Sequence, residues 1–388
     1  MEKEYYLSIL SGRQRGFLAA FIRSFLSAFT YPYLAVLNTR NALYKYGIAK
    51  SKTLPARVIS IGNITTGGTG KTPLVEFSAR YLQKKGKIVA ILSRGYGEQV
   101  LQTTKGNLTA EDNNFKIGKF VNDEYLILKE NLKDEPILLG KDRVQTGEKA
   151  IRDYDANCLI LDDGFQHLRM KRDLDIVVID SLNPFAGESL IPRGSLREPI
   201  KNLKRADLFV LSHCNQSDEN TIKLIYKKLN QINSEIPVCE SIHEPVYIEN
   251  INDSSKLETE WLRGKRVYGL CAIGNPESFA STLKELGVDL IRFLPFHDHH
   301  YYTQEELDSV ITEAKSLGVD AIVVTQKDLV KIRNKNINDA NILSLKIEIR
   351  ITKGMEYYEE AMARILIQNH SPNHIVQQSS NHKSSNEI

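Results

Sequence analysis

Residues 57–72 read Arg-Val-Ile-Ser-Ile-Gly-Asn-Ile-Thr-Thr-Gly-Gly-Thr-Gly-Lys-Thr, and they carry the strongest structural signal in the chain. The run from Arg57 to Ile61 is rich in β-branched residues, which is typical of a strand buried in a parallel sheet. A helix is expected from about Pro73 to Lys84, since proline is tolerated where a first-turn amide has no partner within the helix. This strand, glycine-rich turn and helix predict an α/β fold.

The glycine-rich turn between this strand and helix predicts a phosphate-binding loop (P-loop). Its backbone amides and the positive end of the following helix converge on one point, as a polyphosphate requires. In such a loop Lys71 reaches the β and γ phosphates of a nucleotide, and the hydroxyl of Thr72 binds Mg²⁺. The residues expected to bind the nucleotide are Thr65, Thr66, Gly67, Gly68, Thr69, Gly70, Lys71 and Thr72.

The loop departs from the common pattern at its first position. A glycine usually stands where this chain has Thr65, and we expect Gly67 and Gly68 to supply the missing backbone freedom. The alternative is a glycine-rich turn followed by an unrelated Lys-Thr pair, and the flanking strand and helix argue against it. The sequence therefore favours a P-loop NTPase-like α/β/α domain.

A second buried strand is predicted at Cys158–Leu161, and Asp162 and Asp163 follow it directly. In P-loop proteins a carboxylate at such a strand end faces the metal ion that the P-loop hydroxyl binds. The alternative is a capped turn, because Asp and Gly are common turn residues. The presence of a P-loop elsewhere in the chain favours a Mg²⁺ role for both aspartates.

Two signatures of switch GTPases do not fit this sequence. Their switch motif would place Asp at position 161, where this chain has Leu161, and their base-reading motif would place Lys at position 326, where it has Gln326. The GTPase interpretation is weakened accordingly.

The composition indicates more than one globular part. The chain has 388 residues, too many for one typical core, so we expect two domains with terminal extensions. Its net charge is +3, but residues 1–52 alone carry +6, which leaves −3 for residues 53–388. A basic excess confined to the N-terminal segment argues against a nucleic-acid-binding body and suits an element that faces an anionic surface.

The four cysteines predict neither a zinc site nor a disulfide framework. Cys158, Cys214, Cys239 and Cys271 are far apart and form no CxxC pair. We interpret them as small buried residues of a protein in a reducing compartment.

The N-terminal segment predicts an amphipathic helix associated with a membrane. Only Arg23 is charged between Gly16 and Thr39, and apolar residues recur there at helical spacing, namely Phe17, Leu18, Phe21, Ile22, Phe25 and Phe29. Pro32 is expected to interrupt this run after about fifteen residues, short of the roughly 20 needed to span a bilayer. We therefore favour an interfacial anchor over a span. A cleaved signal peptide and a helix packed on its own domain are the alternatives.

These signals divide the chain into four parts. They are an N-terminal membrane-associated helical segment (1–50), a P-loop domain (51–245), a smaller α/β domain (246–370) and a disordered tail (371–388) rich in Ser, Asn, Gln and His. A polar surface loop is expected at 98–122. In the second domain we expect strands at 265–271, 288–294 and 321–325, a helix that starts at Asn275-Pro276, and a helix from the Thr303 capping box to Leu317.

A histidine-rich run, Phe296-His297-Asp298-His299-His300-Tyr301, lies between these elements. It is compatible with a metal site or with a solvated loop. Its place at the C-terminal end of a strand also suits an active site between the two domains.

An ordered set of motifs resembles the tetraacyldisaccharide 4'-kinase family, from the N-terminal helix to about residue 365. The set comprises residues 62–73, 93–97, 122–124, 162–167, 192–199, 298–299 and 325–328. The P-loop motif alone is only moderately specific for this family, whereas the complete series of motifs in this order is strong evidence for the resemblance.

The resemblance implies an activity and a location. Members transfer the γ-phosphoryl group of ATP, with Mg²⁺, to the 4'-hydroxyl of a lipid A disaccharide 1-phosphate precursor. They work at the cytoplasmic face of the inner membrane. The partners implied for this chain are therefore that lipid precursor and the membrane surface, and no nucleic acid.

The resemblance also implies roles for single residues. Asp123 would be the catalytic carboxylate that accepts the hydroxyl proton, and His299 would orient it. Lys71 and Arg197 would stabilise the transferred charge. Mg²⁺ would be held by oxygens of Thr72, Asp162, Asp163 and Glu198. Asn122 stands where family members commonly have Gly, and this difference affects only the expected conformation of the local turn.

Two functions of other classes remain open at this stage. A nucleotide-dependent regulator would hydrolyse ATP or GTP slowly without an acceptor. A membrane adaptor with a purely structural P-loop would keep its function after Lys71→Ala.

Overall fold

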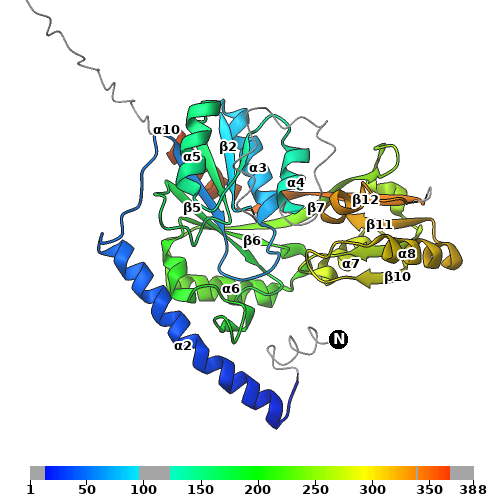
Figure 1. Ribbon diagram of the computed structural model, residues 1–388, viewed down its shortest axis with the longest axis horizontal. Coiled ribbons are helices and arrows are strands. Elements are labelled where there is room, and N and C mark those ends of the chain that lie inside the picture. Colours follow the sequence, from blue (N-terminus) through cyan, green and yellow to red (C-terminus); the bar gives the residue numbers. More distant parts are fainter. Residues whose placement is uncertain (1–13, 96–122, 338–339, 368–388) are drawn as a thin grey trace, which may run out of the picture.

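The computed structural model describes residues 14–95, 123–337 and 340–367. The loop expected at 98–122, Asn122 itself and the tail expected at 371–388 lie outside these ranges. A single sheet runs through the whole described part of the chain, with helices on both of its faces (Figure 1). The predicted α/β fold is confirmed.

The first half of the sheet is parallel and contains the P-loop strand. Its order is β3 (Ile137–Leu139), β2 (Val89–Ser93), β4 (Cys158–Asp162), β1 (Arg57–Gly62), β5 (Leu174–Asp180) and β6 (Leu208–Ser212). Every residue of β1 and β4 is buried, as their predominantly apolar sequences predict. In register, Ile61 of β1 pairs with Asp162 of β4, so the P-loop and the acidic turn leave the sheet at the same edge.

The second half of the sheet joins the first through two long strands. β7 (Val238–Asn250) pairs in parallel with β6 and in antiparallel with β12 (Ile342–Lys353). Beyond β12 follow β11 (Ala321–Thr325), β9 (Arg266–Cys271) and β10 (Asp289–Pro295), while β8 (Lys256–Leu257) pairs with β7. The three strands predicted for this half are confirmed within one or two residues.

The boundary expected at 245/246 falls inside β7, so the backbone crosses it in an unbroken strand. The C-terminal helix α10 (Met355–Ile367) then returns to the first half of the sheet. There Tyr358 and Met362 pack in one core with Leu74 and Leu82 of the P-loop helix. The last described residues therefore belong to the core that supports the P-loop.

Helices cover both faces of the sheet. They are α3 (Lys71–Lys84), α4 (Asp123–Asn131), α5 (Arg143–Tyr154), α6 (Glu219–Ile232), α7 (Pro276–Glu285), α8 (Gln304–Leu317) and α9 (Gln326–Ile332). The predicted caps are confirmed, since the Asn275 side chain accepts from the Ser278 amide and Thr303 forms a capping box with Glu306.

The N-terminal helix α2 (Phe17–Lys45) is one rod of 29 residues along one side of the molecule (Figure 1). The prediction that Pro32 interrupts the apolar run was wrong. Pro32 lacks the N–H group that would bond a carbonyl one turn earlier in the helix. Because Pro32 is exposed, water can bond that carbonyl instead, and the helix continues. By length and composition alone, α2 could cross a membrane.

Candidate active site

The P-loop places Lys71 at the first turn of α3. Gly70 adopts a left-handed conformation with φ of 80°, and a Cβ there would come within 2.6 Å of His243 Nε2. Glycine is therefore required at this position for both conformation and space. The Lys71 side chain is 9% exposed, and its Nζ lies 3.5 Å from a carboxylate oxygen of Asp163.

The structure explains how Thr65 replaces the usual glycine. Thr65 forms an antiparallel bridge with Leu196, an extended conformation that any residue can adopt. The unusual backbone angle falls on Gly67, with φ of 108°. Asn63 Nδ2 donates to Thr69 Oγ1 at 2.9 Å and holds the loop from inside.

Asp162 and Asp163 sit side by side in different electrostatic surroundings. Burial, together with Glu124 and Asp163, raises the pKa of Asp162 to about 7, and Ser93 Oγ donates to its Oδ2 at 3.1 Å. Burial opposes ionisation of Asp163 too, but Lys71 and Arg197 outweigh it and hold the pKa of that carboxyl below its ordinary value. Arg197 Nη1 donates to both Asp163 oxygens at 2.8 and 2.7 Å.

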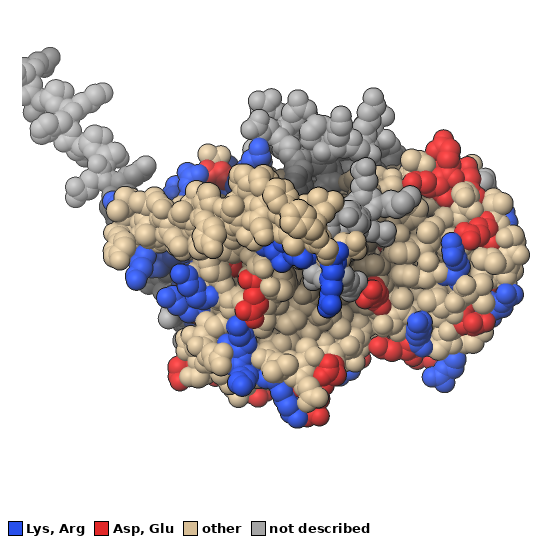
Figure 2. Space-filling view, turned by 90° about the horizontal axis from the view of Figure 1, so that it is seen from below, with Lys and Arg blue, Asp and Glu red and all other residues tan. Residues whose placement is uncertain are grey.

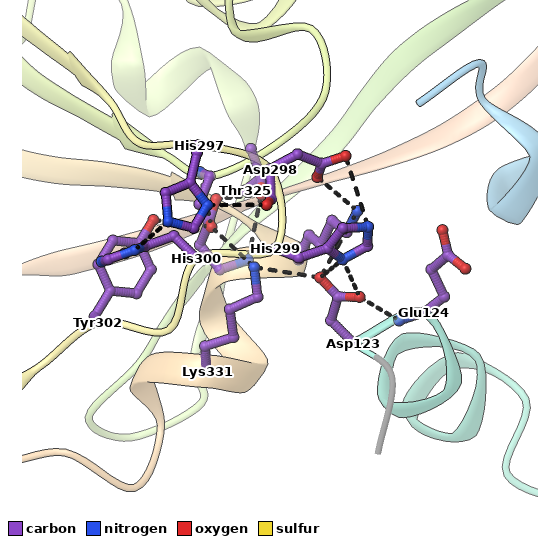
Figure 3. Close-up of polar contacts among 12 residues, drawn as sticks. Asp123, Glu124, His297, Asp298, His299, His300, Tyr302, Thr325 and Lys331 are labelled. Atoms are coloured by element: carbon purple, nitrogen blue, oxygen red, sulfur yellow. Dashed lines mark hydrogen bonds and ion pairs between the residues drawn. The ribbon is translucent and has the colours of Figure 1, made fainter. Parts of the chain in front are cut away.

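Asp123 begins α4 and meets His299 from the loop after β10 (Figure 3). His299 Nδ1 lies 3.0 and 3.1 Å from the two oxygens of Asp123, and its Nε2 lies 3.6 Å from Asp298 Oδ2. The hydrogen bond to Asp123 raises the pKa of His299. Two residues 176 positions apart in sequence thus form one acid–base pair.

Two lysines of α9 also face Asp123, and neither was among the predicted site residues. Lys327 Nζ lies 3.7 Å and Lys331 Nζ 3.2 Å from Asp123 Oδ2. Burial favours the neutral acid, but His299, Lys327 and Lys331 outweigh it and depress the pKa of Asp123. The carboxylate is therefore held ionised. The signal that could have found the lysines is their i, i+4 spacing on one helix face, next to the quoted motif at 325–328.

The P-loop and the surroundings of Asp123 line one cavity of about 200 Å³. The P-loop contributes residues 68–73 to its wall, α4 contributes Glu124, and α9 contributes Lys327. Both halves of the sheet and the loops beside them also contribute lining residues, including His213, His243, Ile273, Asn275, Ser278, Phe279, Leu345 and Ile347. A nucleotide held by the P-loop would therefore lie beside the elements that carry Asp123.

Comparison with known proteins identifies the family of this chain. The family model described as tetraacyldisaccharide-1-P 4'-kinase matches residues 22–366. The chain belongs to the tetraacyldisaccharide 4'-kinase family. The curated 4'-kinase of Halothermothrix orenii is 34% identical over 363 residues, which cover 90% of this chain and 94% of that protein. That of Elusimicrobium minutum is 36% identical over 82% of this chain and 86% of that protein.

A solved structure of the same family is also similar. LpxK from Aquifex aeolicus, in a form termed "apo" and in complex with ATP, superposes with a TM-score of 0.65 at 30% identity. The match covers 89% of this chain and 99% of that one. The resemblance inferred from the motifs is thereby confirmed, and with it the prediction of a kinase.

In this 4'-kinase family member, most of the predicted site residues come together. Lys71 of the P-loop, Asp163 and Arg197 form one connected group, and Asp162 lies next to Asp163 with its side chain bonded to Ser93. Asp123 and His299 form a second group beside Glu124 and Lys327, which line the same cavity as Lys71. Among the described residues, no cluster of three or more His, Cys, Asp or Glu could hold a metal ion. His297 and His300 lie apart from Asp123 and contact each other at 3.1 Å (Figure 3). His300 Nε2 also lies 2.8 Å from Glu306 Oε2.

Glu198 does not fit its predicted role as a ligand of Mg²⁺. Its carboxylate is fully buried, with one oxygen 3.1 Å from Arg40 and the other 2.9 Å from Arg205 and 2.7 Å from Asn202. The family resemblance implied a metal role beside Arg197, but the Glu198 carboxylate is instead occupied by contacts with Arg40, Arg205 and Asn202. The geometry makes Glu198 an anchor between α2 and the segment after residue 197.

Glu198→Gln is therefore expected to destabilise the protein by about 3 kcal/mol, because it leaves two arginines without a buried counter-charge. Urea unfolding measures the change. The matched control is Glu244→Gln, whose exposed pair with Arg350 should contribute less than about 1 kcal/mol. Equal effects of the two substitutions would contradict the anchoring role.

Proposed function

We propose that the protein phosphorylates the 4'-hydroxyl of a tetraacyldisaccharide 1-phosphate with ATP, as a step of lipid A biosynthesis. The observation that carries this proposal is the shared cavity. Its wall joins the P-loop to Glu124 and Lys327, which flank the Asp123–His299 pair. Phosphoryl transfer requires a phosphate clamp and an acceptor site close together, and little covalent chemistry from the protein.

The P-loop side of the cavity would bind ATP. Amides of residues 65–72 surround its phosphates, and Lys71 neutralises the β and γ phosphates. Oxygens of Thr72, Asp162 and Asp163 would hold Mg²⁺, which neutralises phosphate charge when bound. The donor set fits a hard cation, and the buried Asp162 beside two other carboxylates is a group that a cation would stabilise.

The Asp123 side would receive the sugar hydroxyl. Because Asp123 is held ionised, it can accept the hydroxyl hydrogen bond and then the proton as the new P–O bond forms. His299 donates through Nδ1 and fixes the orientation of the carboxylate. Arg197, next to Asp163 and Lys71, would balance the charge of the transferred group.

The N-terminal helix would bring the enzyme to its lipid substrate at the cytoplasmic face of the inner membrane. Its C-terminal half is docked, since Tyr33, Leu34 and Leu37 pack against the body. The part that precedes the docked residues, residues 17–30, is about 14 residues and roughly 21 Å long, short of the ~30 Å hydrocarbon core. This supports an interfacial anchor rather than a span.

The direct test is incubation with ATP, Mg²⁺ and tetraacyldisaccharide 1-phosphate in detergent, with analysis of the lipid product. We expect one phosphate to be added at the 4'-hydroxyl. A folded, ATP-binding preparation that leaves this acceptor unchanged would overturn the proposal. Slow hydrolysis of ATP alone would then indicate the regulator class.

The His299–Asp123 pair predicts a pH-dependent contribution to stability. The pKa of Asp123 is depressed, so its contribution is present above the ordinary value near 4 and is lost as the pH falls. The pKa of His299 is raised, so its contribution is present below about 6.5 and is lost as the pH rises through the raised value. Asp298, Lys327 and Lys331 face the same pair.

We therefore expect the difference in unfolding free energy between wild type and His299→Ala to be largest between about pH 4 and 6.5. Urea unfolding at a series of pH values measures it. In the Asp123→Asn background the same substitution should have a smaller and flatter effect. A difference independent of pH in both backgrounds would refute the coupling.

A further inference from the structure

The two halves of α2 have different environments. In the N-terminal half, Phe17, Phe21 and Phe25 are 89%, 60% and 56% exposed. In the C-terminal half, Tyr33, Leu34 and Leu37 join the core cluster that also contains Phe165 and Leu196. Figure 2, seen from the side of α2, shows a largely uncharged ridge with Lys and Arg beside it. The helix thus links an exposed apolar surface to the body of the enzyme.

The docked half of α2 makes two polar contacts with consecutive residues. Tyr33 Oη donates to the carbonyl of Arg197 at 2.8 Å. Arg40 Nη2 donates to Glu198 Oε1 at 3.1 Å. Residues 33 and 40 are seven apart, about two helical turns, so both side chains leave the same face of the helix. The helix therefore holds the backbone and the side chain of one short segment.

The held segment carries the arginine beside the phosphate-binding residues. The Arg197 amide donates to the Ile64 carbonyl at 2.7 Å, at the entrance to the P-loop. Its guanidinium bonds both oxygens of Asp163, which in turn lies 3.5 Å from Lys71. An unbroken series of contacts thus runs from α2 through residue 197 to Asp163 and Lys71.

A second series of contacts passes through Glu198. Its other carboxylate oxygen binds Arg205 at 2.9 Å, and the Arg205 guanidinium lies 4.3 Å from the centre of the Phe165 ring. Phe165 follows Asp162 and Asp163 in the acidic turn. Glu198 is completely buried, whereas Arg40 is one-third exposed, so Arg40 is the accessible end of this series.

We infer that Tyr33 and Arg40 are positioning residues for phosphoryl transfer, which couple the membrane-facing helix to the placement of Arg197. This inference rests on the proposed function and adds a regulatory element to it. Neither side chain touches the cavity. Both act by fixing residues 197 and 198, and through them the orientation of the guanidinium toward Asp163 and the transferred phosphate.

The coupling predicts a defect in turnover rather than in anchoring. Arg40→Met keeps the hydrocarbon stem, and Tyr33→Phe keeps the ring, so Leu34 and Leu37 still dock the helix. We expect each variant to lower kcat for the lipid acceptor about 10- to 100-fold, the loss that a 1 Å misplacement can cause. The KM for the acceptor should stay within about twofold, and Arg40→Lys should recover part of kcat.

The experiment measures kcat and KM in mixed micelles, sedimentation with anionic phospholipid vesicles, and acceptor-free ATP hydrolysis for each variant. Arg350→Met is the matched control, because it removes an exposed arginine paired with Glu244 at 2.8 Å. It should turn over like wild type. Thermal unfolding of every variant verifies that the fold is intact.

Two outcomes would overturn the inference. The first is wild-type kcat in both Arg40→Met and Tyr33→Phe. The second is a loss of turnover that merely follows loss of vesicle binding, which would make α2 an anchor only. If the wild-type protein does not phosphorylate the acceptor, the proposed function is wrong, but the inference can still be tested. The rate of acceptor-free ATP hydrolysis is then compared between wild type and the two variants. A reduced rate in both variants would support it, and an unchanged rate would refute it.

Discussion

Asp123→Asn is expected to lower kcat about 10³-fold, within the range for loss of a positioned general base. Asn is close to Asp in shape but cannot take the hydroxyl proton. Its amide group would also face the donors His299, Lys327 and Lys331, which now surround a carboxylate. ATP affinity should change little, because the ion-pair partners of Asp123 are His299, Lys327 and Lys331, none of which belongs to the P-loop. Steady-state turnover with the lipid acceptor, beside equilibrium nucleotide binding, measures both quantities.

Glu130→Gln provides the control for Asp123→Asn. Glu130 lies on the same helix, α4, but pairs with Arg333 at 2.7 Å and is absent from the cavity wall. Its kcat should match wild type. Asp123→Asn with normal turnover would rule out Asp123 as the base, and loss of ATP binding in the same variant would make its role structural.

Lys71→Ala is expected to reduce kcat by about 10²- to 10³-fold, as removal of one preorganised donor to a developing charge does. The side chain is 9% exposed and sits between the P-loop amides and Asp163. Its loss also leaves Asp163 with Arg197 alone, so like-charge repulsion between Asp163 and the phosphates increases. ATP binding should weaken together with turnover, which isothermal titration and phosphate transfer assays measure.

The matched control for Lys71→Ala is Lys84→Ala, at the exposed C-terminal end of the same helix. It should leave nucleotide binding and turnover unchanged. If Lys71→Ala kept full function at the membrane, as Lys84→Ala should, the P-loop would have a purely structural role. The protein would then be better described as a membrane adaptor.

Local signals predicted much of the fold and part of the site. The P-loop, the acidic strand end and the caps at Asn275 and Thr303 depend on residues within a few positions of one another, and the structure contains each of them. These features are set by backbone amides, turn conformations and helix ends, which a short stretch of sequence determines.

What the sequence did not predict depends on distant contacts. Lys331 meets Asp123 only because the order of strands brings α9 beside α4. Glu198 follows Arg197 in sequence, but its role is set by Arg40, 158 positions earlier. Pro32 reads as a helix breaker, yet in an exposed helix its missing hydrogen bond can be replaced by water. None of these three features is encoded by a pattern of neighbouring residues in the sequence.

The return of α10 to the P-loop half bears on how the chain acquires its fold during synthesis. Tyr358 is completely buried against Phe77 and Tyr81, and its hydroxyl donates to Ser78 at 2.8 Å. The nascent nucleotide-binding core therefore stays open on one side until residues 355–367 have left the ribosome. A chain that stopped at residue 353 would present those aromatic rings to water, and quality-control proteases should remove it faster than the complete protein.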